Sequence, residues 1–201
     1  MEIIILLLFL AYFIGAIPTA YILTKKILKI DIRKYGSGNV GATNAARKLG
    51  FKMGALVALV DIGKGLIPIL IARILMPVAS PAFHLYIIGI FAILGHVKSI
   101  FLKFDGGKGV ATTFGVILGV APISFVVMGL VWLLISFLLK IVSVASLLAG
   151  LTLPFSALVF TGSSIQVFFA ALIFIVLVIT HRGNIKRLIR GEENPINLGD
   201  S

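Results

Sequence analysis

The chain has 201 residues, of which 60% are hydrophobic and only 12% are charged, and its formal net charge is +11. Soluble domains carry about twice that charged fraction, so the composition predicts one all-α membrane domain over residues 1–201, built mostly of transmembrane helices. The absence of cysteine excludes disulfides, thiol catalysis and zinc–thiolate sites. The basic charge is typical of the cytoplasmic loops of membrane proteins, and no nucleic-acid-binding motif accompanies it.

The first apolar run, residues 3–24, is long enough to cross a bilayer, and Pro18 predicts a kink within it. Glu2 stands where a signal peptide would be basic, which favours a retained span. Basic residues follow at once, so the positive-inside rule places them on the cytoplasmic side and the N-terminus outside. They are Lys25, Lys26, Lys29, Arg33, Lys34, Arg47, Lys48 and Lys52.

The first polar segment, residues 36–48, is rich in glycine and small polar residues. Its glycines favour turns, and Thr43 or Asn44 is expected to cap a short helix that follows. A loop that leads into a helix offers free backbone N–H groups to an anion. The side chains that would add donors are Ser37, Thr43, Asn44 and Arg47. The alternative is an ordinary loop whose basic residues only set membrane orientation.

The second span covers residues 53–75, and the third returns over residues 82–97 and ends near His96. Within the second span, Asp61 and Lys64 are three residues apart on one helix face and are predicted to pair. A buried ionisable pair in a span either serves a functional site or only locks helices together, and the sequence leaves both open.

The second polar segment, residues 98–113, places Gly106, Gly107 and Gly109 around Lys108 ahead of a helical pattern. Backbone N–H groups and one cation would again converge on an anion. The segment is not a Walker A loop, because Leu102 and Gly109 stand where that motif needs glycine and Ser or Thr.

The remaining apolar residues are predicted to form four spans, 110–121, 122–139, 141–160 and 165–180, divided first at Pro122. Four crossings return the basic tail to the cytoplasm, which gives seven transmembrane helices with the C-terminus inside. Gly115 and Gly119 have the small-residue spacing of closely packed helices. Because residues 110–121 are few for a span, a re-entrant segment there is the structural alternative.

The third polar segment, residues 181–193, begins with His181 and Asn184 on one helix face, and Ser143 and Ser146 come to the same membrane level. Arg187 and Arg190 are expected to contact lipid headgroups. The histidine spacing matches no metal motif, so neither a metal site nor another cofactor is expected. The residues alone thus predict an inner face that binds phosphates, without naming a reaction.

Together, residues 37–47, 95–112 and 181–188, with Asp61-x-x-Lys64-Gly65 between them, resemble the bacterial acyl-phosphate-dependent glycerol-3-phosphate acyltransferase family. The chain departs from the family pattern at Lys98–Ser99, where the family usually has Phe-Pro. The resemblance implies transfer of an acyl group from acyl phosphate to the 1-hydroxyl of sn-glycerol 3-phosphate, the first step of phospholipid synthesis. The products would be lysophosphatidic acid and inorganic phosphate.

The resemblance also implies roles for individual residues. Catalysis would fall to His181, Asn184 and Lys108, with His181 or the substrate's own phosphate as the base. Phosphate binding would involve Ser37, Thr43, Asn44, Arg47, Lys108, Ser143 and Ser146, and the acyl phosphate would lie on the amides of Gly106, Gly107 and Gly109. Asp61, Lys64, His96 and Glu193 would orient these groups. The enzyme would be a monomer in the bacterial inner membrane, in contact with membrane lipid, with its active site on the cytoplasmic face.

Two other functions compete with an acyltransferase. A phosphate or anion transporter predicts polar residues along a complete crossing path, whereas here they gather at one face and the outer half carries little beyond Arg73. A structural membrane scaffold leaves all three polar segments unexplained.

Overall fold

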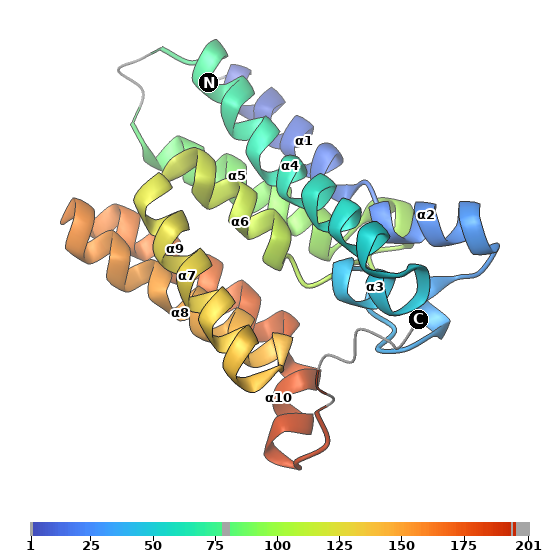
Figure 1. Ribbon diagram of the computed structural model, residues 1–201. Helices are drawn as coiled ribbons and strands as arrows, with labels where there is room; N and C mark the ends of the chain where they lie inside the picture. Colours follow the sequence, from blue (N-terminus) through green and yellow to red (C-terminus); the bar gives the residue numbers. More distant parts are fainter. Residues whose placement is uncertain (1, 78–80, 194, 196–201) are drawn as a thin grey trace.

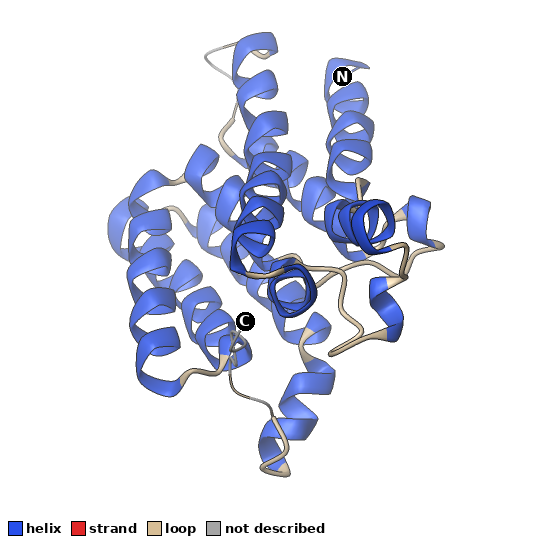
Figure 2. Cartoon of the chain, turned by 45° about the vertical axis from the view of Figure 1, so that its right-hand side comes forward, coloured by secondary structure: helices blue, strands red, loops and turns tan. Residues whose placement is uncertain are grey.

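The computed structural model of the chain describes residues 2–77, 81–193 and 195. These residues form ten α-helices and two short 3-10 helices joined by loops and turns (Figures 1 and 2). No strand occurs among them, so the all-α prediction is confirmed. In chain order the helices are α1 (Glu2–Ala16), α2 (Thr19–Leu28), η1 (Ile32–Lys34), α3 (Ala42–Leu49), α4 (Phe51–Leu75), α5 (Phe83–Val97), η2 (Ile100–Leu102), α6 (Val110–Val120), α7 (Pro122–Leu139), α8 (Val142–Thr161), α9 (Ser164–Thr180) and α10 (Arg182–Ile189).

Most of the helices are suited to a bilayer. Five stretches of the described chain are long and apolar enough to cross one: 2–28, 51–75, 83–102, 122–139 and 142–161. A sixth would combine α9 and α10, although the chain bends by 62° between them. The 11 residues of α6 rise roughly 16 Å, about half of the hydrocarbon thickness. Every segment expected to span is helical, while seven crossings and the sides of the two termini stay predictions.

Large apolar side chains cover the outside of the helices. Ile74 on α4 is 80% exposed and Phe137 on α7 is 81% exposed. Such side chains are stable at an outer surface where hydrocarbon rather than water surrounds them.

Two local features follow the sequence directly. α1 ends at Ala16 and α2 begins at Thr19, so the predicted kink at Pro18 is confirmed as a break in the helix. Asp61 and Lys64 form the predicted pair on α4, with Oδ1 and Nζ 2.7 Å apart. The segment between α4 and α5 falls partly outside the described residues, which omit 78–80.

The long helices pack as two groups. α1, α4, α5 and α6 contact one another, α7, α8 and α9 form the second group, and α6–α7 and α5–α9 contacts join the two. Figure 1 shows α6 between the groups, α3 beside α4, and α10 continuing from α9 away from the bundle. Residues of all three polar segments line one cavity, so the segments lie close to one another in this arrangement.

α6 lies close against α4 because glycines line their contact. A Cβ atom on Gly115 would overlap the Ile62 carbonyl, one on Gly65 would overlap the Thr112 carbonyl, and one on Gly119 would press on Ile69. The prediction that Gly115 and Gly119 permit close packing is therefore confirmed. The Arg73 side chain of α4 adds a hydrogen bond, its Nε donating to the Gly119 carbonyl at 3.1 Å.

Gly115→Ala is expected to destabilise the protein, because the added methyl group forces α6 away from the α4 backbone. Overpacking of this kind costs about 1–3 kcal/mol. The measurement is the Tm of purified protein in detergent, with Gly63→Ala on α4 as the matched control, since a Cβ atom there meets only Ile67 Cδ1 at 3.9 Å. Equal Tm values for the two variants would show that the close contact does not limit stability.

Candidate functional site

A cavity of about 910 Å³ lies where the three polar segments meet the two helix groups. Residues of all three segments line its polar part, which we call the polar end. Its apolar part, the apolar groove, is lined by Ile62 of α4, Phe114 of α6, and Phe125, Trp132 and Leu133 of α7. The cavity can therefore hold a molecule with both an anionic group and a hydrocarbon chain.

Most of the residues predicted for the site line this cavity. They are Ser37, Thr43, Asn44, Arg47, Asp61, His96, Lys108, Gly109, Ser143, Ser146, His181, Asn184 and Glu193. Lys64, Gly106 and Gly107 line instead a small neighbouring cavity of about 10 Å³, which His96 also borders. The sequence analysis thus predicted which segments line the cavity, but it did not predict that these residues are divided between two cavities.

The first polar segment is organised by Asn44, and the structure corrects two predictions there. α3 begins at Ala42 with Gly41 at its N-cap and no side-chain cap, so the prediction of a Thr43 or Asn44 cap is wrong. The buried Asn44 amide donates to the carbonyls of Tyr35 (3.0 Å) and Asn39 (3.1 Å) and accepts from the Ser37 N–H (3.3 Å). Because these loop groups occupy it, its predicted part in phosphate binding is replaced by a structural one.

The loop around Asn44 depends on glycine. Gly36 and Gly38 have φ values of +56° and +70°, which side chains rarely adopt. A Cβ atom on Gly36 would also overlap the Asn44 Oδ1 atom. These turns fold the loop over α3 and leave Ser37 and Arg47 at the cavity.

In the second polar segment, two of the predicted amide donors are already bonded. Gly106 N–H donates to the Val97 carbonyl at 3.1 Å, and Gly107 N–H donates to the His96 carbonyl at 3.0 Å. Both amides are thus bonded to the end of α5, and contact between them and an anion stays a prediction.

Free amides lie one step further along the chain. The first backbone bond of α6 joins Thr113 N–H to the Gly109 carbonyl at 2.8 Å. Within the described residues, the N–H groups of residues 108–112 have no backbone acceptor. The free amides of this segment thus belong to the first turn of α6, with Lys108 beside it.

The departure at Lys98–Ser99 has a structural role of its own. Ser99 is buried and its Oγ donates to the Ala16 carbonyl at 2.6 Å, while the Lys98 carbonyl accepts from Tyr12 Oη at 2.7 Å. Both bonds tie the start of the second polar segment to α1.

In the third polar segment, Glu193 gathers three donors. Its Oε1 accepts from Ser143 Oγ (2.7 Å) and Asn184 Nδ2, and its Oε2 accepts from Arg187 Nε at 2.7 Å. Burial opposes ionisation of Glu193, but these hydrogen bonds and the Arg187 charge outweigh it and lower its pKa. The sequence analysis expected Arg187 to contact lipid headgroups, whereas the structure pairs it with Glu193 at the cavity wall. The only sign of this pair in the sequence is that the two residues are six positions apart.

His181 is held in one protonation state. Its Nδ1 lies 2.7 Å from the Leu177 carbonyl, which can only accept, so Nδ1 carries the proton. Burial lowers the pKa of His181 to about 4, so the ring is neutral near pH 7 and its Nε2 is a free proton acceptor.

The unpaired cations of the site gather at its polar end. Among the described residues, the Arg47 guanidinium and the Lys108 ammonium have neither a hydrogen-bond nor an ion-pair partner. Burial lowers the pKa of Lys108 to about 8; nearby Glu193 opposes this, while Arg187 and Arg47 add to it. An anion would relieve this mutual repulsion.

The described residues contain no group of three or more His, Cys, Asp or Glu side chains that could hold a metal ion.

Known proteins are similar to this chain in sequence and in fold. A model of the glycerol-3-phosphate acyltransferase family matches residues 5–191. The chain is 41% identical to the glycerol-3-phosphate acyltransferase of Staphylococcus aureus strain Newman and 42% identical to that of strain bovine RF122, in both cases over 96% of this chain and 98% of the relative.

Solved structures agree with the sequence relatives. Crystal structures of PlsY (YgiH), an integral membrane glycerol 3-phosphate acyltransferase, in its glycerol 3-phosphate and lysophosphatidic acid forms superpose with TM-scores of 0.89 and 0.86. Each is 38% identical, and the match covers 96% of this chain and 94% of that one.

Proposed function

The chain belongs to the glycerol-3-phosphate acyltransferase family of integral membrane proteins, and on this premise we propose that its acyl donor is an acyl phosphate. The acyl group passes to the 1-hydroxyl of sn-glycerol 3-phosphate and gives lysophosphatidic acid and inorganic phosphate. The observation that carries the proposal is the shape of the large cavity, which joins a cationic end to an apolar groove. Both substrates carry a phosphate, and only the donor carries a long chain.

Glycerol 3-phosphate binds on the first polar segment in this proposal. The Arg47 guanidinium presents a planar set of donors to the phosphate, and Ser37 and Thr43 line the cavity beside it. The glycerol 3-phosphate and lysophosphatidic acid forms of the similar PlsY structures support a site for this headgroup.

The acyl phosphate binds at the start of α6. Lys108 and the free N–H groups of residues 108–112 meet the phosphate and the developing oxyanion, in the place first assigned to the Gly106 and Gly107 amides. Its chain lies along the apolar groove, where the Phe114 ring packs edge-on against Phe125 and Trp132, with ring centroids 6.0 and 6.4 Å apart.

The reaction needs no covalent enzyme intermediate. The glycerol hydroxyl oxygen attacks the acyl carbonyl carbon, the bond from that carbon to the phosphate oxygen breaks, and phosphate leaves with the bonding electrons. The hydroxyl proton goes to a base, for which the free Nε2 of His181 is our candidate and the phosphate of glycerol 3-phosphate the alternative. Asn184, fixed by Glu193, and Ser143 and Ser146 orient the acceptor.

The membrane setting is proposed on the same basis. The chain forms one domain and acts as a monomer in the bacterial cytoplasmic membrane, with seven spans, the N-terminus outside and the C-terminus inside. The polar segments then face the cytoplasm, where glycerol 3-phosphate is dissolved. A transporter is less well supported, because Arg73, the cation of the outer half, is bonded to the Gly119 carbonyl.

Purified protein given glycerol 3-phosphate is expected to form lysophosphatidic acid from palmitoyl phosphate but not from palmitoyl-CoA. The product is followed by mass spectrometry, with Arg47→Ala as a control that removes the proposed phosphate clamp. Product from palmitoyl-CoA would keep the acyltransferase and overturn the donor. Folded protein without product from either donor would direct attention to anion flux in liposomes.

His181→Gln is expected to lower kcat by about 10²–10⁴-fold with little change in either KM, because a general base acts only in the reaction step. Steady-state kinetics measure this, with His84→Gln as the matched control, since His84 lies on α5 outside the large cavity. A kcat near the wild-type value would transfer the base role to the phosphate of the substrate.

The decline in rate at high pH is expected to follow the loss of charge of the Lys108 ammonium. Its lowered pKa means that the ammonium is charged below pH 8 and loses its charge as pH rises through about 8, so kcat/KM for acyl phosphate should fall there. In Lys108→Arg, the guanidinium keeps its charge to pH values above ~12, so the decline should disappear from this range. A decline that persists unchanged in Lys108→Arg would assign it to another group.

A further inference from the structure

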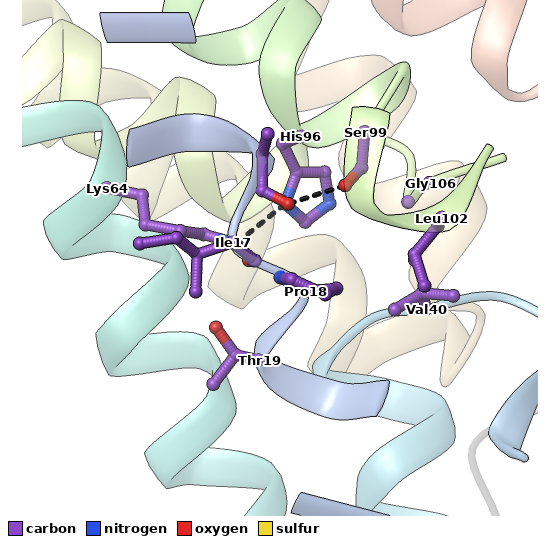
Figure 3. A pocket seen from close by; sticks show the side chains of 11 residues that line it. Ile17, Pro18, Thr19, Val40, Lys64, His96, Ser99, Leu102 and Gly106 are labelled. Carbon is purple, nitrogen blue, oxygen red and sulfur yellow. Dashed lines mark hydrogen bonds between the residues drawn. The ribbon is translucent and has the colours of Figure 1, made fainter. Parts of the chain in front are cut away.

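The ammonium of Lys64 connects three parts of the fold inside the helix bundle. The side chain is buried, and its Nζ contacts Asp61 Oδ1 at 2.7 Å, the Ile17 carbonyl at 2.6 Å and His96 Nδ1 at 3.3 Å. Figure 3 shows Lys64, Ile17 and His96 around the small cavity. Of these three contacts of the ammonium, only one is the ion pair with Asp61.

One of these contacts reaches the break in the first span. Pro18 ends the regular helix, and the two carbonyls before it are bonded from other elements, Ala16 by Ser99 Oγ at 2.6 Å and Ile17 by Lys64. The Ile17 carbonyl also accepts from the Thr19 N–H at 3.1 Å, so Lys64 is a second donor to it and ties the break to α4. If Lys64 only neutralised Asp61, its ammonium would not need to contact the Ile17 carbonyl as well.

The other contact leads to the second polar segment. Because the Lys64 ammonium only donates, His96 Nδ1 accepts and the proton of the neutral ring lies on Nε2. The Nε2 edge lies against Gly107, where a Cβ atom would overlap it, and Gly107 N–H donates to the His96 carbonyl at 3.0 Å. His96 thus contacts Gly107 through both its ring and its backbone carbonyl. Because Lys108 directly follows Gly107 in the chain, these contacts also fix the backbone at Lys108.

We infer that Lys64 is a positioning residue for the acyl donor: through His96 and Gly107 it sets the place of Lys108 and of the first turn of α6. The inference rests on the proposed function for the identity of that donor. Arg47 belongs to the first polar segment, and among the described residues it has no hydrogen bond or ion pair with Lys64, His96 or Gly107. Loss of the Lys64 ammonium should therefore weaken binding of the acyl donor far more than binding of glycerol 3-phosphate.

The test uses full-length protein in which the pair is removed without leaving a lone charge, Asp61→Asn with Lys64→Met. KM for palmitoyl phosphate is expected to rise about tenfold or more, as when an outer residue that orients a binding group is lost, while KM for glycerol 3-phosphate stays within about twofold. Asp61→Asn alone should raise the donor KM far less than the double variant, because the new side-chain amide still offers a carbonyl to Lys64 and the His96 contact remains.

Arg73→Met is the matched control, because Arg73 is also a cation of α4 bonded to a backbone carbonyl, but at the far end of α6. A role limited to locking helices would lower Tm in both variants and leave the ratio of the two KM values unchanged, which would overturn the inference. If the double variant does not fold, His96→Asn replaces it: the amide keeps an acceptor for Lys64 and removes the ring edge from Gly107. An unchanged donor KM in His96→Asn would equally overturn the inference.

Failure of the proposed donor is distinguishable from failure of this inference. The wild-type protein is assayed first with palmitoyl phosphate and palmitoyl-CoA, and turnover with palmitoyl-CoA alone contradicts the proposed function. The variants are then compared on whichever donor supports turnover, and the KM ratio still decides whether Lys64 positions the donor site.

Discussion

Hydrocarbon supplies no hydrogen-bond partners, so every polar group buried among these helices must find one within the protein. Two of the three cations of α4, Lys64 and Arg73, meet this constraint in different ways. Arg73 donates to the Gly119 carbonyl at the end of α6, and Lys64 divides its donors among Asp61, Ile17 and His96. The arrangement of α1, α4, α5 and α6 follows from these bonds together with the glycine contacts that let α6 approach α4.

At the polar end of the large cavity, by contrast, some charged groups have no partner within the described part of the chain. Among the described residues, Arg47 and Lys108 have no partner there, whereas Arg187 is paired with Glu193. Keeping cations unpaired and partly buried costs free energy, and the lowered pKa of Lys108 is one expression of that cost. A site left in this state gains most when an anion enters, and an anion joined to a chain also fills the apolar groove. Among the described residues some buried hydroxyl groups also lack a partner, but Arg47 and Lys108 carry a full charge, and this is what favours an anion at the cavity.

Local chemistry was enough to predict some of this from the sequence. Proline at 18 breaks a helix wherever it lies, residues three apart on a helix meet, and glycines four apart leave a flat surface, so the break, the Asp61–Lys64 pair and the Gly115 contact were all foreseen. The grouping of the three polar segments at one cavity was also foreseen, because basic loops share one side of a membrane.

The errors concern groups whose partners lie elsewhere in the chain. The Gly106 and Gly107 amides were predicted to be free because their acceptors, the carbonyls of Val97 and His96, belong to the end of α5. Asn44 was predicted to be a cap or an anion ligand because its acceptors lie in the turns of residues 32–39. In both cases glycines bring the distant backbone near, and such an approach has no signature in spacing. The two ends of the short helix α6 differ in the same respect. At its start, the N–H groups of residues 108–112 have no backbone acceptor within the described chain. At its other end, Arg73 bonds to the Gly119 carbonyl, and Gly119 packs against Ile69 of α4, so the open end is the one at the cavity.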